Sequence, residues 1–84
     1  MTLLDELRSN ALSTLECEAA ASGRRIGQLV VAPDPHGLTL RFDLDDTLTT
    51  VHIGMRARDA SRDCGAFASE IVRSVRYVMR PQRG

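Results

Sequence analysis

The chain has 84 residues, of which 43% are hydrophobic and 26% charged, and its 11 basic and 11 acidic residues give a net charge of zero. A chain of this length buries only about 60–65% of the surface that it exposes when unfolded, so we expect one small domain over residues 1–84. The charge balance argues against binding nucleic acid or anionic lipid through bulk charge. Neither a membrane span nor a secretory signal is recognisable, so we expect a cytoplasmic protein, no membrane partner and reduced cysteines.

Residues 2–22 have the pattern of an amphipathic helix. Thr2 followed by Asp5 predicts a capping box at its start, and Ser22-Gly23 predicts its end, because glycine readily adopts a positive φ. Apolar residues recur at steps of three and four and should face the core. These positions are Leu4, Leu7, Ala11, Leu15 and Ala19.

Three strands are predicted next, over residues 26–32, 38–44 and 47–56, with a turn at Asp34–Gly37 between the first two. The second and third strands alternate, and a tight turn at Asp45-Asp46 (or a four-residue loop in the same register) pairs Leu44 with Thr47, Leu40 with Val51 and Leu38 with Ile53. The first strand is apolar on both faces. The apolar residues of this strand that point away from the core therefore either form a contact surface for a partner or a second copy, or are covered by the first helix as the sheet twists.

A second helix is predicted from Asp59 or Ser61 to about Arg80, where Pro81 ends it. Gly65 predicts a short first segment and a bend. The apolar stripe that should face the core comprises Cys64, Phe67, Ala68, Ile71, Val75, Val78 and Met79. The resulting fold class is α+β: an N-terminal helix, a three-stranded antiparallel meander and a C-terminal helix, with the helices packed on one face of the sheet.

The segment Phe42–Leu48 resembles the first motif of the haloacid dehalogenase superfamily. That resemblance implies Asp43 as a nucleophile, Asp45 as the acid/base and Mg²⁺ as the neutralising ion. The superfamily has a doubly wound parallel sheet, for which the 36 residues after the motif are too few, and it needs a Lys or a substitute for it. The alternating strand also differs from a central parallel strand. We therefore expect an acidic turn, no enzymatic activity and no cofactor.

The histidines and cysteines do not have the spacing of a metal site, and we expect no bound metal. Cys17 lies off the apolar stripe of the first helix, which predicts an accessible thiol. Cys64 lies in the stripe of the second helix, which predicts a buried thiol unless the bend at Gly65 exposes it. Both are candidates for an intermolecular disulfide on oxidation.

Two charged patches are candidate binding sites. Asp34, Asp43, Asp45 and Asp46 place four carboxylates within 13 residues, and such a patch can occupy a basic channel that otherwise receives nucleic acid. Arg73, Arg76 and Arg80 share one predicted helix face and are the alternative, as a phosphate-contacting patch. A solvated turn and a solvated helix end are the corresponding non-functional interpretations.

The small size, the meander-plus-helix layout and the acidic hairpin are similar to those of phage-encoded anti-CRISPR proteins. This resemblance implies a non-catalytic inhibitor or adaptor that binds a host or phage protein complex, such as a CRISPR surveillance complex, and blocks its access to target DNA through the acidic patch. One alternative is a small transcriptional regulator that binds nucleic acid through the arginine face, although the chain has few aromatic residues for base stacking. Another is a secretion-type chaperone, whose opening helix and strands are broadly similar.

Overall fold

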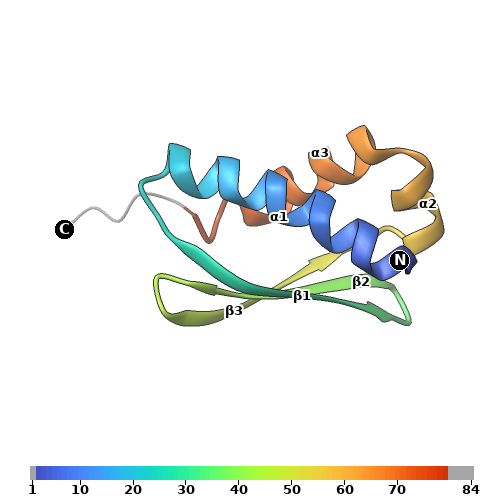
Figure 1. Ribbon diagram of the computed structural model, residues 1–84, viewed down its shortest axis with the longest axis horizontal. Helices are drawn as coiled ribbons and strands as arrows, with labels where there is room; N and C mark the ends of the chain where they lie inside the picture. The colour runs from blue at the N-terminus through green and yellow to red at the C-terminus, as the bar shows by residue number, and fades with distance from the viewer. Residues whose placement is uncertain (1, 80–84) are drawn as a thin grey trace.

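The computed structural model describes residues 2–79 and has two layers, a sheet and a set of helices that covers one of its faces (Figure 1). The sheet is antiparallel, with strand order β1-β2-β3. The elements are α1 (Leu3–Ala21), β1 (Ile26–Asp34), β2 (Gly37–Leu44), β3 (Thr47–Ile53), α2 (Ala57–Arg62) and α3 (Cys64–Val75). The predicted α+β class and the placement of the helices on one face are confirmed.

Both predicted ends of α1 are confirmed. The Thr2 hydroxyl accepts a hydrogen bond from the Asp5 backbone N–H at 3.2 Å, and the Asp5 carboxylate accepts one from the Thr2 N–H at 3.3 Å, which completes a capping box. At the other end Gly23 has φ +67°, and the Arg24 N–H donates to the Ala19 carbonyl at 2.8 Å. This is a Schellman arrangement, which ends the helix and directs the chain into the sheet.

The β2–β3 hairpin has the predicted register: Leu44 pairs with Thr47, Leu40 with Val51 and Leu38 with Ile53. Its turn has two residues, Asp45 and Asp46, with φ values of +50° and +67°. Positive φ at both positions is the type I′ conformation, whose twist matches that of the flanking strands. The third strand ends at Ile53, earlier than the predicted Arg56, because the chain bends at Gly54 and Met55, where β2 has only Gly37 left beyond Leu38.

A β-bulge in the first strand places Ile26 on the same inner face as Leu29 and Val31, although the three residues do not follow one simple alternation. Gly27 pairs with Asp43 and Val30 with Arg41, so Gln28 and Leu29 together lie opposite one residue of β2. The extra residue shifts the alternation, which leaves Leu29 and Val31 buried and Val30 55% exposed on the outer face. The apolar surplus predicted for the outer face of this strand is thereby reduced to Val30.

The second helical region is divided at Asp63, two residues before the predicted bend. Asp63 has φ −135° and ψ 84°, and its carboxylate accepts a hydrogen bond from the Ala66 N–H at 3.0 Å. The predicted caps at Asp59 and Ser61 are wrong: α2 begins earlier, at Ala57, without a side-chain cap. An aspartate bonded to nearby backbone N–H groups favours a helix start over a helix interior, which explains the break.

The core between the two layers is aliphatic apart from two phenylalanines. No polar or charged residue is buried among residues 2–79. The fully buried large side chains come from β2, β3, α1 and α3, whereas β1 contributes Leu29 to the core at 2% exposure. They are Phe42, Phe67, Leu7, Leu15, Leu38, Leu40, Ile53, Ile71 and Val75. α3 ends at Val75, before the predicted Arg80, which lies outside the described residues.

Candidate functional site at the acidic hairpin

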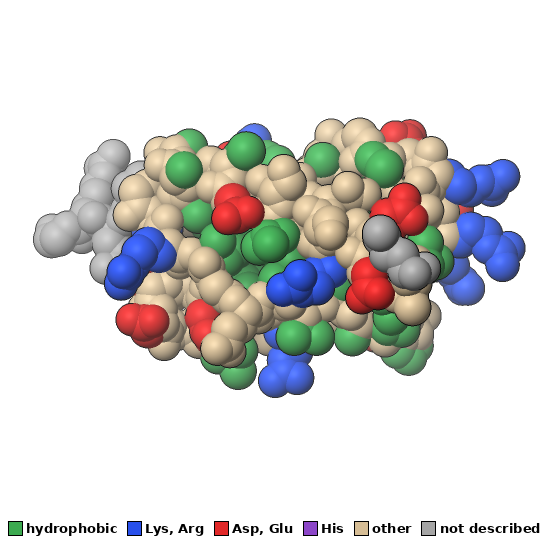
Figure 2. All heavy atoms as spheres, in the orientation of Figure 1, with side chains coloured by type: hydrophobic (Ala, Val, Ile, Leu, Met, Phe, Trp, Pro, Cys, Tyr) green, Lys and Arg blue, Asp and Glu red, His purple; other side chains and the backbone are tan. Residues whose placement is uncertain are grey.

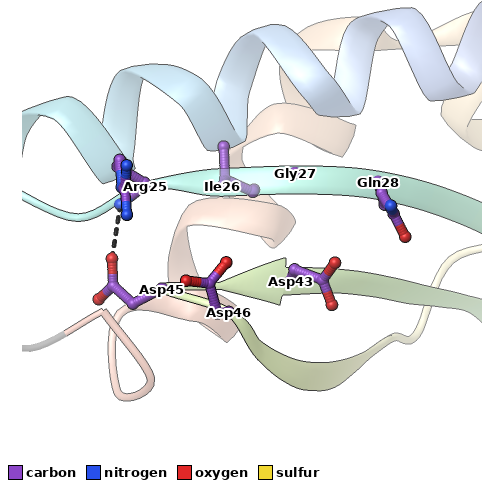
Figure 3. Close-up of a pocket in the computed structure, with 7 residues that line it drawn as sticks. All are labelled: Arg25, Ile26, Gly27, Gln28, Asp43, Asp45 and Asp46. Carbon is purple, nitrogen blue, oxygen red and sulfur yellow. Dashed lines mark hydrogen bonds between the residues drawn. The ribbon is translucent and has the colours of Figure 1, made fainter.

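Three of the four predicted acidic residues line one surface hollow. The hollow has a volume of about 320 Å³ and lies between the beginning of β1 and the β2–β3 turn. Figure 3 shows the β1 residues on one side and the aspartates on the other. The lining residues are Arg25, Ile26, Gly27, Gln28, Asp43, Asp45 and Asp46.

The hollow exists because of the register between β1 and β2. Asp43 points to the outer face of the sheet, and its partner on β1 is Gly27, which has no side chain to cover it. The bulge at Gln28 follows immediately and displaces the next side chain. Asp43 is consequently only half-buried, at the floor of a depression that a larger residue at position 27 would fill.

The Asp45 carboxylate makes contacts that stabilise the fold. Its carboxylate accepts a hydrogen bond from the Arg25 backbone N–H at 2.9 Å and forms an ion pair with the Arg24 guanidinium. The Asp45 N–H in turn donates to the Arg25 carbonyl at 2.9 Å. The Arg25 N–H and then the Arg24 side chain lower the pKa of Asp45. Much of the Asp45 charge is therefore balanced within the molecule, and the acidic surface is left mainly to Asp43 and Asp46.

Asp43 and Asp46 are the two carboxylates of the hollow that the rest of the described chain does not engage. Within residues 2–79 neither side chain makes an ion pair or a side-chain hydrogen bond. Asp46 is exposed at the tip of the turn, and Asp43 is half-buried beside exposed Leu48, its partner on β3. Two carboxylates beside an apolar side chain are suited to a cationic group with an aliphatic stem, such as Arg or Lys.

Asp34 does not belong to this surface. It pairs with Gly37 at the opposite end of β2, about 23 Å from the Asp45–Asp46 turn at the usual rise of a strand. Its carboxylate accepts hydrogen bonds from the Thr39 hydroxyl at 2.5 Å and the His36 N–H at 2.7 Å, and contacts His52 Nδ1 at 2.9 Å. The Thr39 hydrogen bond is the main cause of a lowered pKa for Asp34. Asp34 stabilises the β1–β2 turn.

The predicted arginine patch is present in part. Arg73 and Arg76 are exposed and line a hollow of about 440 Å³ on α3 with Ala68, Ser69 and Val72. Glu70 approaches Arg73 at 3.9 Å, a contact of a kind that is weak in solvent. Arg80, the third predicted member, lies outside the described residues.

Both cysteines are free and exposed. The accessible thiol predicted for Cys17 is confirmed. The buried position predicted for Cys64 is wrong, because the break at Asp63 makes Cys64 the first residue of α3 and turns it to the surface, where Asn10 Nδ2 lies 3.6 Å from its sulfur. The alternative prediction, that a bend in the helix exposes Cys64, agrees with the structure, although the break lies at Asp63.

A further basic cluster was missed by the sequence reasoning. Figure 2 shows arginine side chains gathered at the end of the molecule where α2 lies. Arg56, Arg58 and Arg62 are all exposed there. Their spacing of two and four residues is visible in the sequence, but a helix capped by Asp59 or Ser61 excludes Arg56 and Arg58, whereas α2 begins at Ala57 with Arg56 as its N-cap.

No protein-family model, curated protein or solved structure matches this chain. Within residues 2–79, no group of three or more His, Cys, Asp or Glu residues is placed to hold a metal ion. None of the helices in the same range combines the length and the apolar character that a membrane crossing requires.

Proposed function

We propose that the protein is a non-catalytic binding module, an inhibitor or adaptor, that docks a basic surface of a partner protein on the hollow beside Asp43 and Asp46. The observation that carries this proposal is that these two carboxylates have no partner among residues 2–79 and flank a preformed depression. Their backbone is held by the β2–β3 register and by the contacts of Asp45, so little ordering accompanies binding.

The partner class that we propose is a nucleic-acid-binding complex with Lys and Arg in its channel, of which a CRISPR surveillance complex is the specific example. Such a channel is complementary to clustered carboxylates through charge and shape. The patch is smaller than four carboxylates, because Asp34 is distant and Asp45 is paired. We therefore propose that it occupies one local basic site and does not imitate a length of DNA backbone.

The test compares two matched double variants. Asp43→Asn/Asp46→Asn removes both carboxylates of the hollow with little change in shape, whereas Glu6→Gln/Glu16→Gln removes two exposed charges from α1. A purified CRISPR surveillance complex is incubated with each protein, and its binding to target DNA is measured. We expect inhibition by the wild type and by the α1 variant, and at least about a tenfold loss of inhibition for the hollow variant. Equal inhibition by both variants contradicts the role of the hollow, and its absence for the wild type contradicts this partner.

The second candidate function is nucleic-acid binding through α3. It is favoured by the exposure of Arg73 and Arg76 beside the hollow on α3, to which Arg80 adds a predicted charge. Arg73→Gln/Arg76→Gln, measured for binding to duplex DNA at several salt concentrations, should then reduce both affinity and its salt dependence. An unchanged salt dependence contradicts this function.

Two further expectations remain as proposals. A secretion-type chaperone would bind an extended segment of its client along the sheet, and client binding is its test. A cysteine-linked homodimer would form on oxidation through Cys17 or Cys64, both of which are exposed. Cys17→Ser and Cys64→Ser, compared by non-reducing electrophoresis after oxidation, identify which thiol is used.

A further inference from the structure

Among residues 2–79 no strand pairs with the outer edge of β3, and this edge carries none of the features that usually keep a sheet edge from pairing. The strand has no bulge, since every residue from Thr47 to Ile53 has its partner on β2 in unbroken register. It contains no Pro and no Asp, Glu, Lys or Arg. Short, charged, bulged or proline-containing edges are how monomeric sheets avoid strand addition. This edge is regular, seven residues long and rich in threonine and β-branched residues.

The backbone groups of alternate residues are available along this edge. The residues that flank a two-residue hairpin turn form a hydrogen-bonded pair, and bonded and non-bonded pairs alternate from there. Leu44 and Thr47 are the flanking pair, so Leu48, Thr50 and His52 direct their N–H and C=O groups away from β2. Their side chains are all exposed on the outer face of the sheet, with Leu48 at 63%.

A second feature lies next to the open edge in the helical layer. The hollow on α3 is lined, among the described residues, by α3 alone, so it lies on a flank that α1 does not cover. α1 packs on β1 and α3 packs on β3. The uncovered flank is therefore on the β3 side of the molecule. It presents Ala68, Ser69 and Val72, residues small enough for another helix to approach closely, together with the exposed side chains of Arg73 and Arg76.

We propose that β3 pairs with β3 of a second copy of this chain, antiparallel and about a two-fold axis at Thr50, to form a continuous six-stranded sheet. This register gives the longest overlap of β3 with itself. It places Thr50 opposite Thr50 of the partner copy, with Leu48 opposite His52 and Thr49 opposite Val51. No like charges face each other between the two strands, and the Thr50–Thr50 and Thr49–Val51 pairs are of the β-branched kind that stabilises sheets.

A second copy fits this region better than a single bound peptide does, because it fills both features at once. The same two-fold axis that pairs the β3 edges turns the uncovered flanks of the two α3 helices toward each other. The interface thus continues both layers of the fold. It uses neither cysteine, and it leaves Asp43 and Asp46 in place, so it is independent of the function proposed for the acidic hollow. It competes with the second candidate function, which uses the same hollow on α3.

The test exploits the symmetry of the pairing. Thr50→Lys places two lysines directly opposite each other, each beside Arg41 of its own chain. Val30→Lys is the matched control, because Val30 pairs with the other side of Arg41 on the same row of the outer face, at the opposite edge of the sheet. Masses are measured by analytical ultracentrifugation with reductant present, from micromolar to several hundred micromolar protein.

We expect the wild type and Val30→Lys to reach twice the 9.2 kDa mass of one chain, and Thr50→Lys to dimerise at least about tenfold more weakly. Mixing Thr50→Lys with Thr50→Glu should restore a dimer that contains one chain of each kind, because the axis then joins opposite charges. A wild type that remains monomeric throughout overturns the proposal, independently of how the variants fold. A Thr50→Lys protein that dimerises as strongly as Val30→Lys also overturns it, since the interface would then lie elsewhere.

Discussion

The two edge strands of the sheet, β1 and β3, differ in nearly every property that decides whether an edge remains unpaired. β1 is interrupted by the bulge at Gln28, contains Pro33 and follows two arginines. The carbonyl of bulge residue Leu29 is also occupied, since Arg8 Nε of α1 donates a hydrogen bond to it at 2.9 Å. β3 has no comparable feature over its seven residues.

This difference shows that edge protection in a small α+β fold is local to each strand. The bulge on β1 lets Ile26 and Leu29 both face the core, and it disrupts the edge as a consequence of that packing. β3 meets the core with simple alternation, in which Val51 and Ile53 are buried, and it needs no bulge. β3, which packs on the core without a bulge, is therefore the strand whose edge remains regular and unprotected.

The largest effect is expected at the end of β3 that contacts the neighbouring turn. Gly37 has φ +148°, and a Cβ added there would lie 2.3 Å from the Ile53 carbonyl oxygen and 2.8 Å from the Met55 backbone nitrogen. Gly37→Ala must therefore push β3 away or distort the turn. We expect a loss of about 3 kcal/mol or more, seen as a fall in Tm of about 12 °C or more by circular dichroism.

Gly23→Ala is the matched control for this substitution. Gly23 also has a positive φ, of +67°, but nothing lies within 4 Å of an added Cβ. Its expected cost is the backbone strain alone, about 1 kcal/mol. If the two variants lose equal stability, the close approach of the β3 end to Gly37 does not add to the cost of a side chain at that position.

An intermediate and pH-dependent effect is expected where β1 begins. Asp45 ties Arg24 and Arg25 to the β2–β3 turn, and its pKa is lowered from the ordinary 3.8. A carboxylate with a lowered folded-state pKa stabilises the fold above its ordinary pKa, and this stabilisation is lost as pH falls through the folded-state value. Asp45→Asn should therefore lower Tm at pH 7, and the difference from wild type should disappear well below pH 3.8.

Asp46→Asn provides the comparison for Asp45. It removes the same charge from the same turn and keeps a residue type that tolerates φ +67°. Because Asp46 has no side-chain partner among residues 2–79, little change in Tm is expected at either pH. A pH-dependent loss for Asp46→Asn as large as that for Asp45→Asn would show that charge on the turn, and not the contacts to Arg24 and Arg25, is what matters.

Much of the fold is predictable because it follows from short-range rules. The capping box at Thr2 and Asp5, the end of α1 at Gly23 and the β2–β3 register are set by residues that are close in sequence. The bulge at Gln28 is not predictable in the same way, because it depends on which residues of β1 the core of α1 and β2 can accommodate. The break at Asp63 is predictable in part. Gly65 indicates a bend in this region, but the residue that caps α3 is Asp63, two residues earlier.

The sequence identifies the type of residue in the candidate site, but not which of these residues lie together in the structure. Sequence spacing groups Asp34 with Asp43, whereas the strand between them separates the two residues by most of its length. Proximity in sequence also does not reveal that Asp45 is paired, because Arg24 is 21 residues away and meets it only when β1 pairs with β2. The hollow beside Asp43 depends on a glycine in another strand, Gly27, and is visible only once the register is known.

The smallest effect is expected at the bulge itself, and it is a gain. Gln28 has φ +49°, a conformation that costs a residue with a side chain roughly 1–2 kcal/mol relative to glycine. Gln28→Gly removes this strain but increases the entropy of the unfolded chain, so the net stabilisation should be about 0.5–1 kcal/mol in chemical denaturation. Gln28→Ala keeps the Cβ and should gain nothing.

A stability gain confined to glycine means that the bulge is imposed on β1 by its register and by the Arg8 contact to Leu29, against the preference of the residue at its centre. If Gln28→Gly instead loses stability, the glutamine side chain itself maintains the protected edge, and the contrast between β1 and β3 has a residue-specific origin at position 28.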